Sequence, residues 1–197
     1  MTAYFISIFL KIFFLLTPFA AVSGFISMTS GCSSGEKRKI ALQTTVAMLA
    51  IVSLVFFFGQ YIFDLFGITL NAFRVGGGAL LFLAGVSLVR GGHAYEKASD
   101  EDDIAVVPMA IPLIVGPGTL AALFIMGAEV VNMREKMVAL SAVLLAVLCV
   151  GGMLFLTVSV ERHIKQKFII MLTKITGLIL ASLAAQIIFD GIKGFLG

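Results

Sequence analysis

Six long apolar stretches run through this 197-residue chain, and each is long enough to cross a lipid bilayer as a helix. The composition agrees, because 60% of the residues are hydrophobic and 13% are charged, with a mean hydropathy of +1.11. A soluble domain of this composition would expose apolar surface and aggregate, and a disordered chain is poor in apolar residues. We therefore expect an all-α integral membrane protein. The predicted spans are residues 4–28, 40–63, 68–90, 104–128, 137–160 and 169–190.

Lysine and arginine are concentrated in alternate connections between these spans. Short loops rich in basic residues remain on the cytoplasmic side, so the first, third and fifth loops are predicted to face the cytoplasm. Both termini then lie outside the cytoplasm, and we expect a multi-pass protein of the cell's inner (plasma) membrane. The dispersal of the basic residues also argues against a nucleic-acid partner. The residues on the predicted cytoplasmic side are Lys37, Arg38, Lys39, Arg90, Lys97, Arg162, Lys165 and Lys167, against Arg134, Lys136 and Lys193 opposite.

The second half of the chain repeats features of the first half at a constant offset, the one that separates Pro18 from Pro117. The Glu-Lys pair at residues 36–37 recurs at 135–136, and Gly78 recurs as Gly177. Each half holds three spans, and an odd number inverts the second half relative to the first, as in many secondary transporters. We expect one membrane domain over residues 1–197. Its parts are a first repeat (about 4–90), a cytoplasmic loop (about 91–103) and a second repeat (about 104–190).

All four prolines lie in the first and fourth spans, at corresponding places in the two halves. Proline lacks a backbone N–H and disfavours helix in the residue before it. Two spans interrupted in equivalent places indicate a binding site near the bilayer midplane. Helices that restart after Pro18 and Pro117 would present free N–H groups and positive dipole ends to a carboxylate. The alternative is that each proline only kinks a packed helix.

Hydroxyl groups near the two breaks and one intramembrane arginine complete the predicted site. Arg74 precedes a run of three glycines, and a charge inside a span indicates function by default. Snorkelling of its side chain to the membrane surface is an equally open interpretation. The candidate substrate-binding residues are Thr17, Pro18, Ser23, Arg74, Gly116, Pro117, Gly118 and Thr119.

Catalytic and metal-binding motifs are not supported. Residues 31–35, Gly-Cys-Ser-Ser-Gly, match G-x-S-x-G, but that motif needs a strand-turn-helix that this chain cannot provide. The sequence has neither the HExxH zinc motif nor a P-loop. We therefore expect no enzyme activity, no metal site and no cofactor.

Acidic residues are missing from the middle of every span, so a buried carboxylate relay for protons is not available. If transport is coupled to an ion, Na⁺ held by carbonyls and hydroxyls at the breaks is favoured over H⁺. Uncoupled movement is equally compatible with the sequence.

Two segments resemble the MarC family of inner-membrane proteins: residues 72–82, Ala-Phe-Arg-Val-Gly-Gly-Gly-Ala-Leu-Leu-Phe, and residues 103–119, which contain Ile-Ala-Val-Val-Pro and Gly-Pro-Gly-Thr. The resemblance extends over nearly the whole chain and implies six spans. A related archaeal member, and the wider similarity to amino-acid exporters of the lysine-exporter type, imply transport of small neutral amino acids such as glycine or alanine. Many members have Asn or Asp before the first proline and a second proline soon after it. This chain has Thr17 and Ser23-Gly24 there instead.

The sequence therefore predicts a secondary transporter for small neutral amino acids or similar small metabolites, with its site where the two broken helices meet. The alternatives are an efflux carrier for drugs or metabolites, and a non-transporting scaffold or lipid-handling protein. The expected partners are a small-molecule substrate and the lipid bilayer, and a homo-oligomer is compatible with this prediction.

Overall fold

The computed structural model describes residues 2–91, 109–110, 114–130, 132–161 and 166–196, and the regular elements in these ranges are all helices. Apolar side chains cover most of each helix, which suits a chain that is surrounded by lipid. The helices are α1 (Thr2–Leu15), α2 (Pro18–Met28), α3 (Ser34–Phe66), α4 (Leu70–Arg90), α5 (Pro117–Glu129), α6 (Met133–Val160) and α7 (Gln166–Leu196).

Five segments of the described chain are long and apolar enough to cross a membrane. Together α1 and α2 form the first of them, over Thr2–Met28, and the other four lie in α3, α4, α6 and α7. They confirm five of the six predicted spans. The remaining one, residues 104–128, falls partly outside the described residues, and the apolar helix α5 forms its second part.

Capping interactions set the helix boundaries near the loops. The Ser33 hydroxyl accepts the Glu36 main-chain N–H at 3.3 Å, and the Glu36 carboxylate accepts the Ser33 N–H at 2.7 Å, which forms a reciprocal capping box at the start of α3. Thr69 and Asn132 cap α4 and α6 with their side chains. Capping residues thus begin each of these helices close to the edge of an apolar run.

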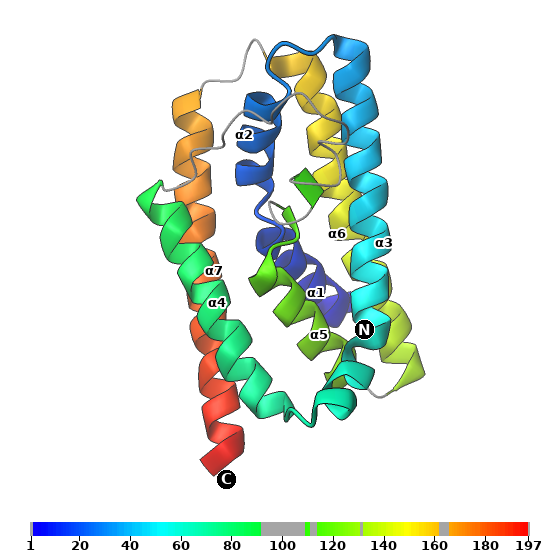
Figure 1. Ribbon diagram of the computed structural model, residues 1–197, viewed down its shortest axis with the longest axis vertical. Coiled ribbons are helices and arrows are strands. Elements are labelled where there is room, and N and C mark those ends of the chain that lie inside the picture. The colour runs from blue at the N-terminus through cyan, green and yellow to red at the C-terminus, as the bar shows by residue number, and fades with distance from the viewer. Residues whose placement is uncertain (1, 92–108, 111–113, 131, 162–165, 197) are drawn as a thin grey trace.

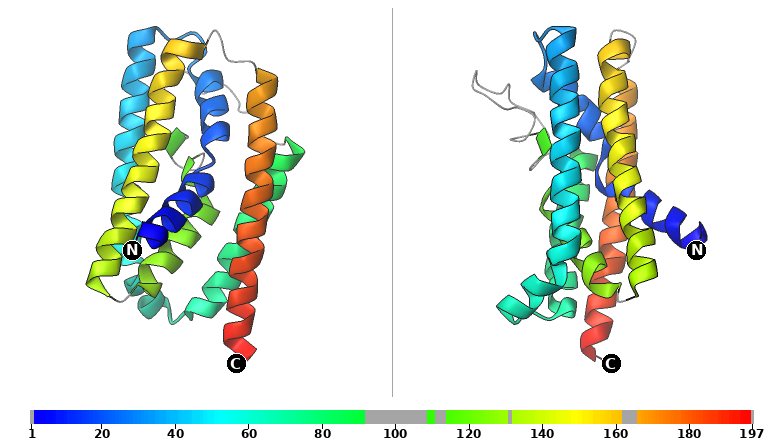
Figure 2. Two further views of the ribbon diagram at one scale, coloured as in Figure 1. Left: turned by 180° about the vertical axis from the view of Figure 1, so that it is seen from behind. Right: turned by 90° about the vertical axis from the view of Figure 1, so that its right-hand side faces the viewer.

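The helices form three layers (Figure 1). One outer layer is the pair α4–α7, and the other is the pair α3–α6. Between them lie α1, α2 and α5, and the view from behind shows the same order (Figure 2). The middle layer packs on both outer layers, since α5 contacts α3 and α4 while α1 and α2 contact α6 and α7. The interruptions therefore lie in the interior of the molecule, whereas the N-terminal part of α1 extends outward past the outer helices (Figure 2).

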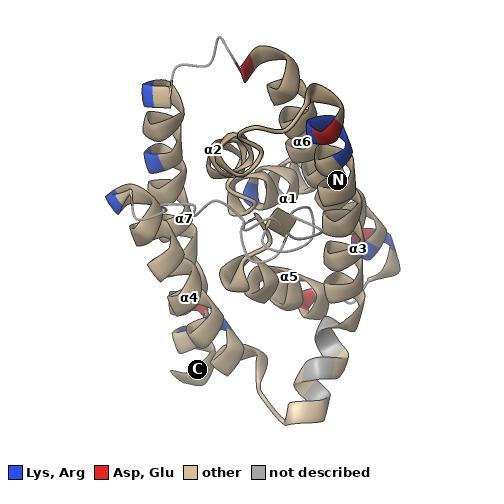
Figure 3. Ribbon diagram, turned by 45° about the horizontal axis from the view of Figure 1, so that its top comes forward, with Lys and Arg blue, Asp and Glu red and all other residues tan. Residues whose placement is uncertain are grey.

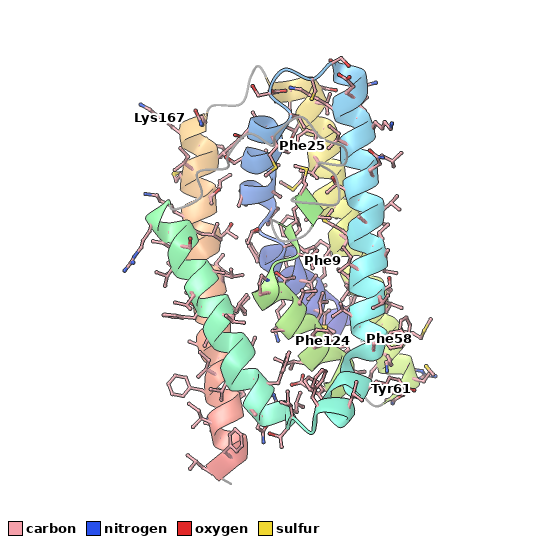
Figure 4. The ribbon with its side chains drawn as sticks, in the orientation of Figure 1. Phe9, Phe25, Phe58, Tyr61, Phe124 and Lys167 are labelled. Carbon is pink, nitrogen blue, oxygen red and sulfur yellow. The ribbon has the colours of Figure 1, made fainter. Side chains whose placement is uncertain are left out.

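Some aromatic side chains are buried in the interior, and others are exposed on the outer surface. Phe25 on α2 is completely buried, whereas Phe58 and Tyr61 near one end of α3 are 53% and 71% exposed (Figure 4). Exposed aromatic residues of this kind are typical of the level of the lipid headgroups. Inside, the rings of Phe63, Phe73 and Phe124 meet edge to face and join α3, α4 and α5.

The connections alternate between the two ends of the molecule. The α2–α3 connection, the end of α4 and the start of α7 lie at one end, which we call the upper end from its place in Figure 1. The α3–α4 and α5–α6 connections and the C-terminus lie at the lower end (Figures 1 and 2). This agrees with the predicted grouping of the loops, although most of the predicted loop 91–103 lies outside the described residues. The assignment of the upper end to the cytoplasm stays a prediction.

Candidate functional site

The first span is interrupted at Leu16 and Thr17. Pro18 has no N–H to continue the ladder, and Thr17 takes a left-handed conformation with φ 47° and ψ 58°. The Thr17 N–H donates to the Phe14 carbonyl at 3.0 Å, which closes α1 with a tight turn, and α2 then begins at Pro18. The predicted break is therefore present, and it redirects the chain between α1 and α2.

The second break precedes α5. The Val115 N–H donates to the Ala110 carbonyl at 2.9 Å, which is a wide π-type turn, and Gly116 is then extended with φ −77° and ψ 172°. Pro117 occupies the first turn of α5, as the sequence predicted. Two helices thus start with proline at corresponding places in the two halves.

The two breaks are in direct contact through one buried hydrogen bond. The Thr119 hydroxyl on α5 donates to the Leu15 carbonyl at the end of α1, at 2.9 Å. Thr119 is 4% exposed, so water does not compete for this bond. In an apolar interior, a carbonyl at a helix end needs a donor from elsewhere. Thr119 supplies that donor and links segments 104 residues apart.

A cavity of about 280 Å³ lies where the breaks meet, and we call it the central cavity. None of the described residues that line it carries a charge. Its polar groups are the Thr17 and Thr119 side chains and the main chain at Gly116 and Gly118, and its other walls are apolar side chains of α4, α5 and α7. The lining residues are Leu15, Thr17, Ala20, Leu80, Leu81, Ala84, Leu88, Ile114, Gly116, Pro117, Gly118, Thr119 and Leu180.

The positive ends of two helix dipoles point toward the central cavity. From the level of the breaks α2 runs to the upper end and α5 runs to the lower end, so both N-termini face the middle of the molecule (Figure 1). No side chain caps either N-terminus. The first N–H groups of a helix have no intrahelical partner and carry partial positive charge. The cavity can therefore accept hydrogen bonds from a ligand hydroxyl and donate them to a carboxylate.

The remaining three candidate residues do not line the central cavity. Pro18 is buried beside Thr17 but does not line the cavity. Ser23 is one turn or more further along α2 and lines two cavities of about 200 and 500 Å³ toward the upper end. Arg74 lies near the lower end, in a separate cavity of about 160 Å³. The structure thus brings together five of the eight candidates: Thr17, Gly116, Pro117, Gly118 and Thr119.

The cavities adjoin one another along the molecule. Ala20 and Leu88 line both the central cavity and the 200 Å³ cavity above it, and Leu15 lines both the central cavity and the 160 Å³ cavity below it. The upper cavities share Ser23 and Gln166. Separate cavities with shared wall residues therefore follow one another from the upper end to the lower end, and the central one lies at the two breaks.

An ion pair lies beside the outermost cavity at each end. At the upper end the Lys37 ammonium contacts the Glu161 carboxylate and joins α3 to the residue that follows α6. At the lower end the Arg74 guanidinium contacts the Glu129 carboxylate and joins α4 to α5. Figure 3 shows charged residues chiefly toward the helix ends.

Sequence reasoning missed several residues of these cavities. Leu80, Leu81, Ala84, Leu88 and Leu180 line the central cavity but are apolar residues like those that face lipid, and no signal distinguishes them. Glu129 could have been noticed as an acid at the end of a span. No group of His, Cys, Asp and Glu side chains suited to a metal occurs in the described part of the chain.

Interrupted helices around an uncharged cavity, in a chain with five segments able to cross a bilayer, define a multi-pass integral membrane protein. The chain belongs to the MarC family, because the model of the MarC family integral membrane protein matches residues 2–196. The resemblance expected from the sequence is therefore confirmed.

Relatives named as UPF0056 membrane proteins match over nearly their full length. One from Methanocaldococcus jannaschii is 37% identical over 98% of each chain. One from Aquifex aeolicus is 32% identical over 98% of this chain and 94% of its own. YhcE of Escherichia coli is 30% identical over 94% of this chain and 90% of its own. These names state a membrane location and no substrate. No solved structure matches the chain.

Proposed function

We propose that this protein is a secondary transporter of the inner membrane that moves small neutral amino acids, or similar small metabolites, without changing them chemically. The observation that carries the proposal is the central cavity, which lies between two helices broken at corresponding places and linked by the Thr119–Leu15 hydrogen bond. Irregular backbone at membrane depth is tolerated where it lines a cavity, and in transporters such breaks form the substrate site.

The size and the charge of the central cavity support a small neutral substrate. Its 280 Å³ lies just below the range of about 300–1,000 Å³ that holds drug-sized ligands. The helix N-termini at Pro18 and Pro117 suit the carboxylate of an amino acid. A substrate with a charged side chain would find no opposite charge among the described lining residues. These features favour amino acids with small side chains over bulky drugs.

Repeated contacts between α4 and α7 support six spans built as two inverted repeats. A Cβ atom on Gly78 would lie 3.2 Å from the Ala184 carbonyl oxygen, and one on Gly177 would lie 2.7 Å from the Gly85 carbonyl oxygen. The offset that relates Pro18 to Pro117 also relates Gly78 to Gly177 and Gly85 to Ala184. The same contact is therefore made twice with the partners exchanged, as a two-fold axis in the membrane plane requires.

The series of cavities supports alternating access. The central cavity adjoins hollows toward both ends, and side chains such as Leu15 and Leu88 stand at the boundaries. A small movement of the α4–α7 layer against the middle layer would widen one boundary or the other. Rocking of one helical unit against another around a fixed site is the usual mechanism of such carriers.

Transport by the purified protein in liposomes tests the proposal. We expect uptake of labelled glycine or alanine, measured across an amino-acid panel with and without Na⁺ and pH gradients. Gly118→Leu should abolish uptake, because even a Cβ there would lie 2.8 Å from the Leu81 Cα. Gly152→Leu on α6 is the matched control, since nothing lies within 4 Å of its added Cβ.

Two outcomes would contradict the proposal. Wild-type protein that moves no member of the panel, although it elutes as a single species, would remove amino-acid transport. Drug uptake by the same liposomes would then favour an efflux carrier, and its absence would favour a scaffold or lipid-handling protein. Equal activity of the Gly118→Leu protein and wild type would place the substrate outside the central cavity.

A further inference from the structure

Four charged side chains line the 160 Å³ cavity at the lower end, which we call the vestibule. Lys11 comes from α1, Arg74 from α4, Glu129 from the last turn of α5 and Asp190 from α7. Two basic and two acidic residues from four different helices therefore line one small hollow. Leu15 also lines the central cavity, so the vestibule adjoins the proposed transport site directly.

Arg74 and Glu129 hold each other in place on one side of the vestibule. The Arg74 Nε and Nη2 atoms both donate to the Glu129 Oε1 atom, and Nη1 donates to the Asn71 Oδ1 atom at 2.9 Å. The Asn71 amide in turn donates to the Gly194 carbonyl at 2.7 Å. These bonds use most donors of the guanidinium, so this pair serves mainly as a fixed wall.

Lys11 and Asp190 have charges that remain available. Among the described residues neither forms an ion pair, and the Asp190 carboxylate accepts one hydrogen bond, from the Gln186 amide at 2.9 Å. Both side chains are exposed to the vestibule and its surroundings. Both charges are therefore free to pair with opposite charges on a ligand.

We propose that the vestibule is a docking site for zwitterionic α-amino acids on their way to or from the central cavity. The proposal rests on the proposed transport function and specifies the substrate class. Lys11 would bind the carboxylate of the amino acid, and Asp190 would bind its ammonium group. A single zwitterionic amino acid carries both of these groups. A simple anion or cation would satisfy one residue and leave the other unmatched. The apolar wall of the vestibule, formed by Ala122, Ile125, Met126, Leu183 and Ile187, suits a small aliphatic side chain.

Protection of an engineered cysteine tests this docking without depending on transport. Leu183→Cys, in a background with Cys32→Ser and Cys149→Ser, places a thiol at the vestibule wall and leaves the Gln186–Asp190 hydrogen bond in place. Alanine should slow the reaction of this thiol with a maleimide, whereas propionate and ethylamine, which each lack one of the two charges, should not. Adding Lys11→Met or Asp190→Asn should raise the alanine concentration for half-protection by about tenfold, because each removes one charge-assisted contact.

A control variant and the possible negative results distinguish failure of the docking site from failure of the transport function. A cysteine at Lys193, exposed on α7 outside the vestibule, should react at the same rate with and without alanine. Equal protection by propionate, or protection unchanged by Lys11→Met and Asp190→Asn, would overturn the docking site. If liposomes still took up alanine in that case, the transport function would be supported without the docking site. Protection of the thiol by alanine without any uptake by liposomes would support amino-acid binding in the vestibule and contradict the transport function.

Discussion

Thr17 holds a backbone conformation that β-branched residues rarely adopt. Its φ of 47° lies in the left-handed region, and among the described residues it is the one non-glycine residue with positive φ. Strain of this kind persists where the surrounding structure imposes it, and it is concentrated at functional sites. The resemblance to the MarC family implies Asn or Asp at this position in many members, and these are the residues that tolerate this conformation best.

Thr17→Asn should therefore stabilise the protein. We expect a gain of about 1 kcal/mol from relief of the left-handed strain, seen as a higher melting temperature in one fixed detergent. Thr17→Val keeps the branched shape without the hydroxyl and is the matched control, which should not gain stability. A melting temperature of Thr17→Asn below that of wild type would show that the Thr17 side chain contributes more than its strain costs.

The residues of the central cavity were predictable where their chemistry is distinctive. Proline, glycine and threonine at the two breaks stand out in an apolar sequence, and the structure places five of them around one hollow. Arg74 also stood out, but its partner Glu129 is 55 residues away, and only the packing of α4 against α5 pairs them. The Leu15 carbonyl belongs to the main chain, so no side chain could have identified it as the acceptor of Thr119.

At the scale of the elements, α4 and α7 pack closely because glycines lie in their interface. A Cβ atom on Gly85 would lie 2.8 Å from both the Ala181 nitrogen and the Gly177 carbonyl oxygen. Small residues that bring backbones together provide much of the association of helices in lipid, where no hydrophobic force acts between them. Gly76 on the same helix meets nothing within 4 Å.

Gly85→Ala should consequently separate α4 from α7. We expect a loss of about 1–3 kcal/mol, because the new methyl group meets main-chain atoms that cannot move aside. Gly76→Ala is the control on the same helix and should match or slightly exceed wild type, since alanine favours helix over glycine. Unfolding in a denaturing detergent measures both variants. Equal changes in stability for the two variants would mean that packing at the α4–α7 interface does not decide the result.

The sequence predicted the long helices well and the interrupted ones only in outline. Apolar length determined α3, α4, α6 and α7, and capping residues such as Ser33 and Asn132 begin two of them before the apolar run starts. The prolines located where α2 and α5 begin. The separate directions of α1 and α2 depend on the conformation of Thr17, which local sequence does not specify.

Considered as a whole, the described part of the molecule has more basic residues at one end than at the other. The upper end contains the starts of α3 and α7, with Lys37, Arg38, Lys39 and Lys167, and the Lys37–Glu161 pair joins α3 to the end of α6 there (Figure 3). The lower end contains fewer basic residues in its connections. This asymmetry is the kind that sets the orientation of a membrane protein during insertion.

Cysteine labelling in intact cells should show which end faces the cytoplasm. In the background without Cys32 and Cys149, Ser34→Cys at the upper end should react with an impermeant maleimide only after the membrane is permeabilised. Asn132→Cys at the lower end should react without permeabilisation, because the excess of basic residues retains the upper end inside. The reverse pattern would invert the orientation, and labelling of both positions without permeabilisation would contradict their placement on opposite sides of the membrane.

The charge of the described walls of the central cavity does not change with pH. No described residue that lines it can gain or lose a proton between acid and alkaline conditions. Its hydroxyls, main-chain amides and helix dipoles keep the same polarity when the cytoplasm acidifies or the surroundings turn alkaline. Binding of a net-neutral solute in this cavity should therefore be constant over the pH range in which the solute keeps its own charges.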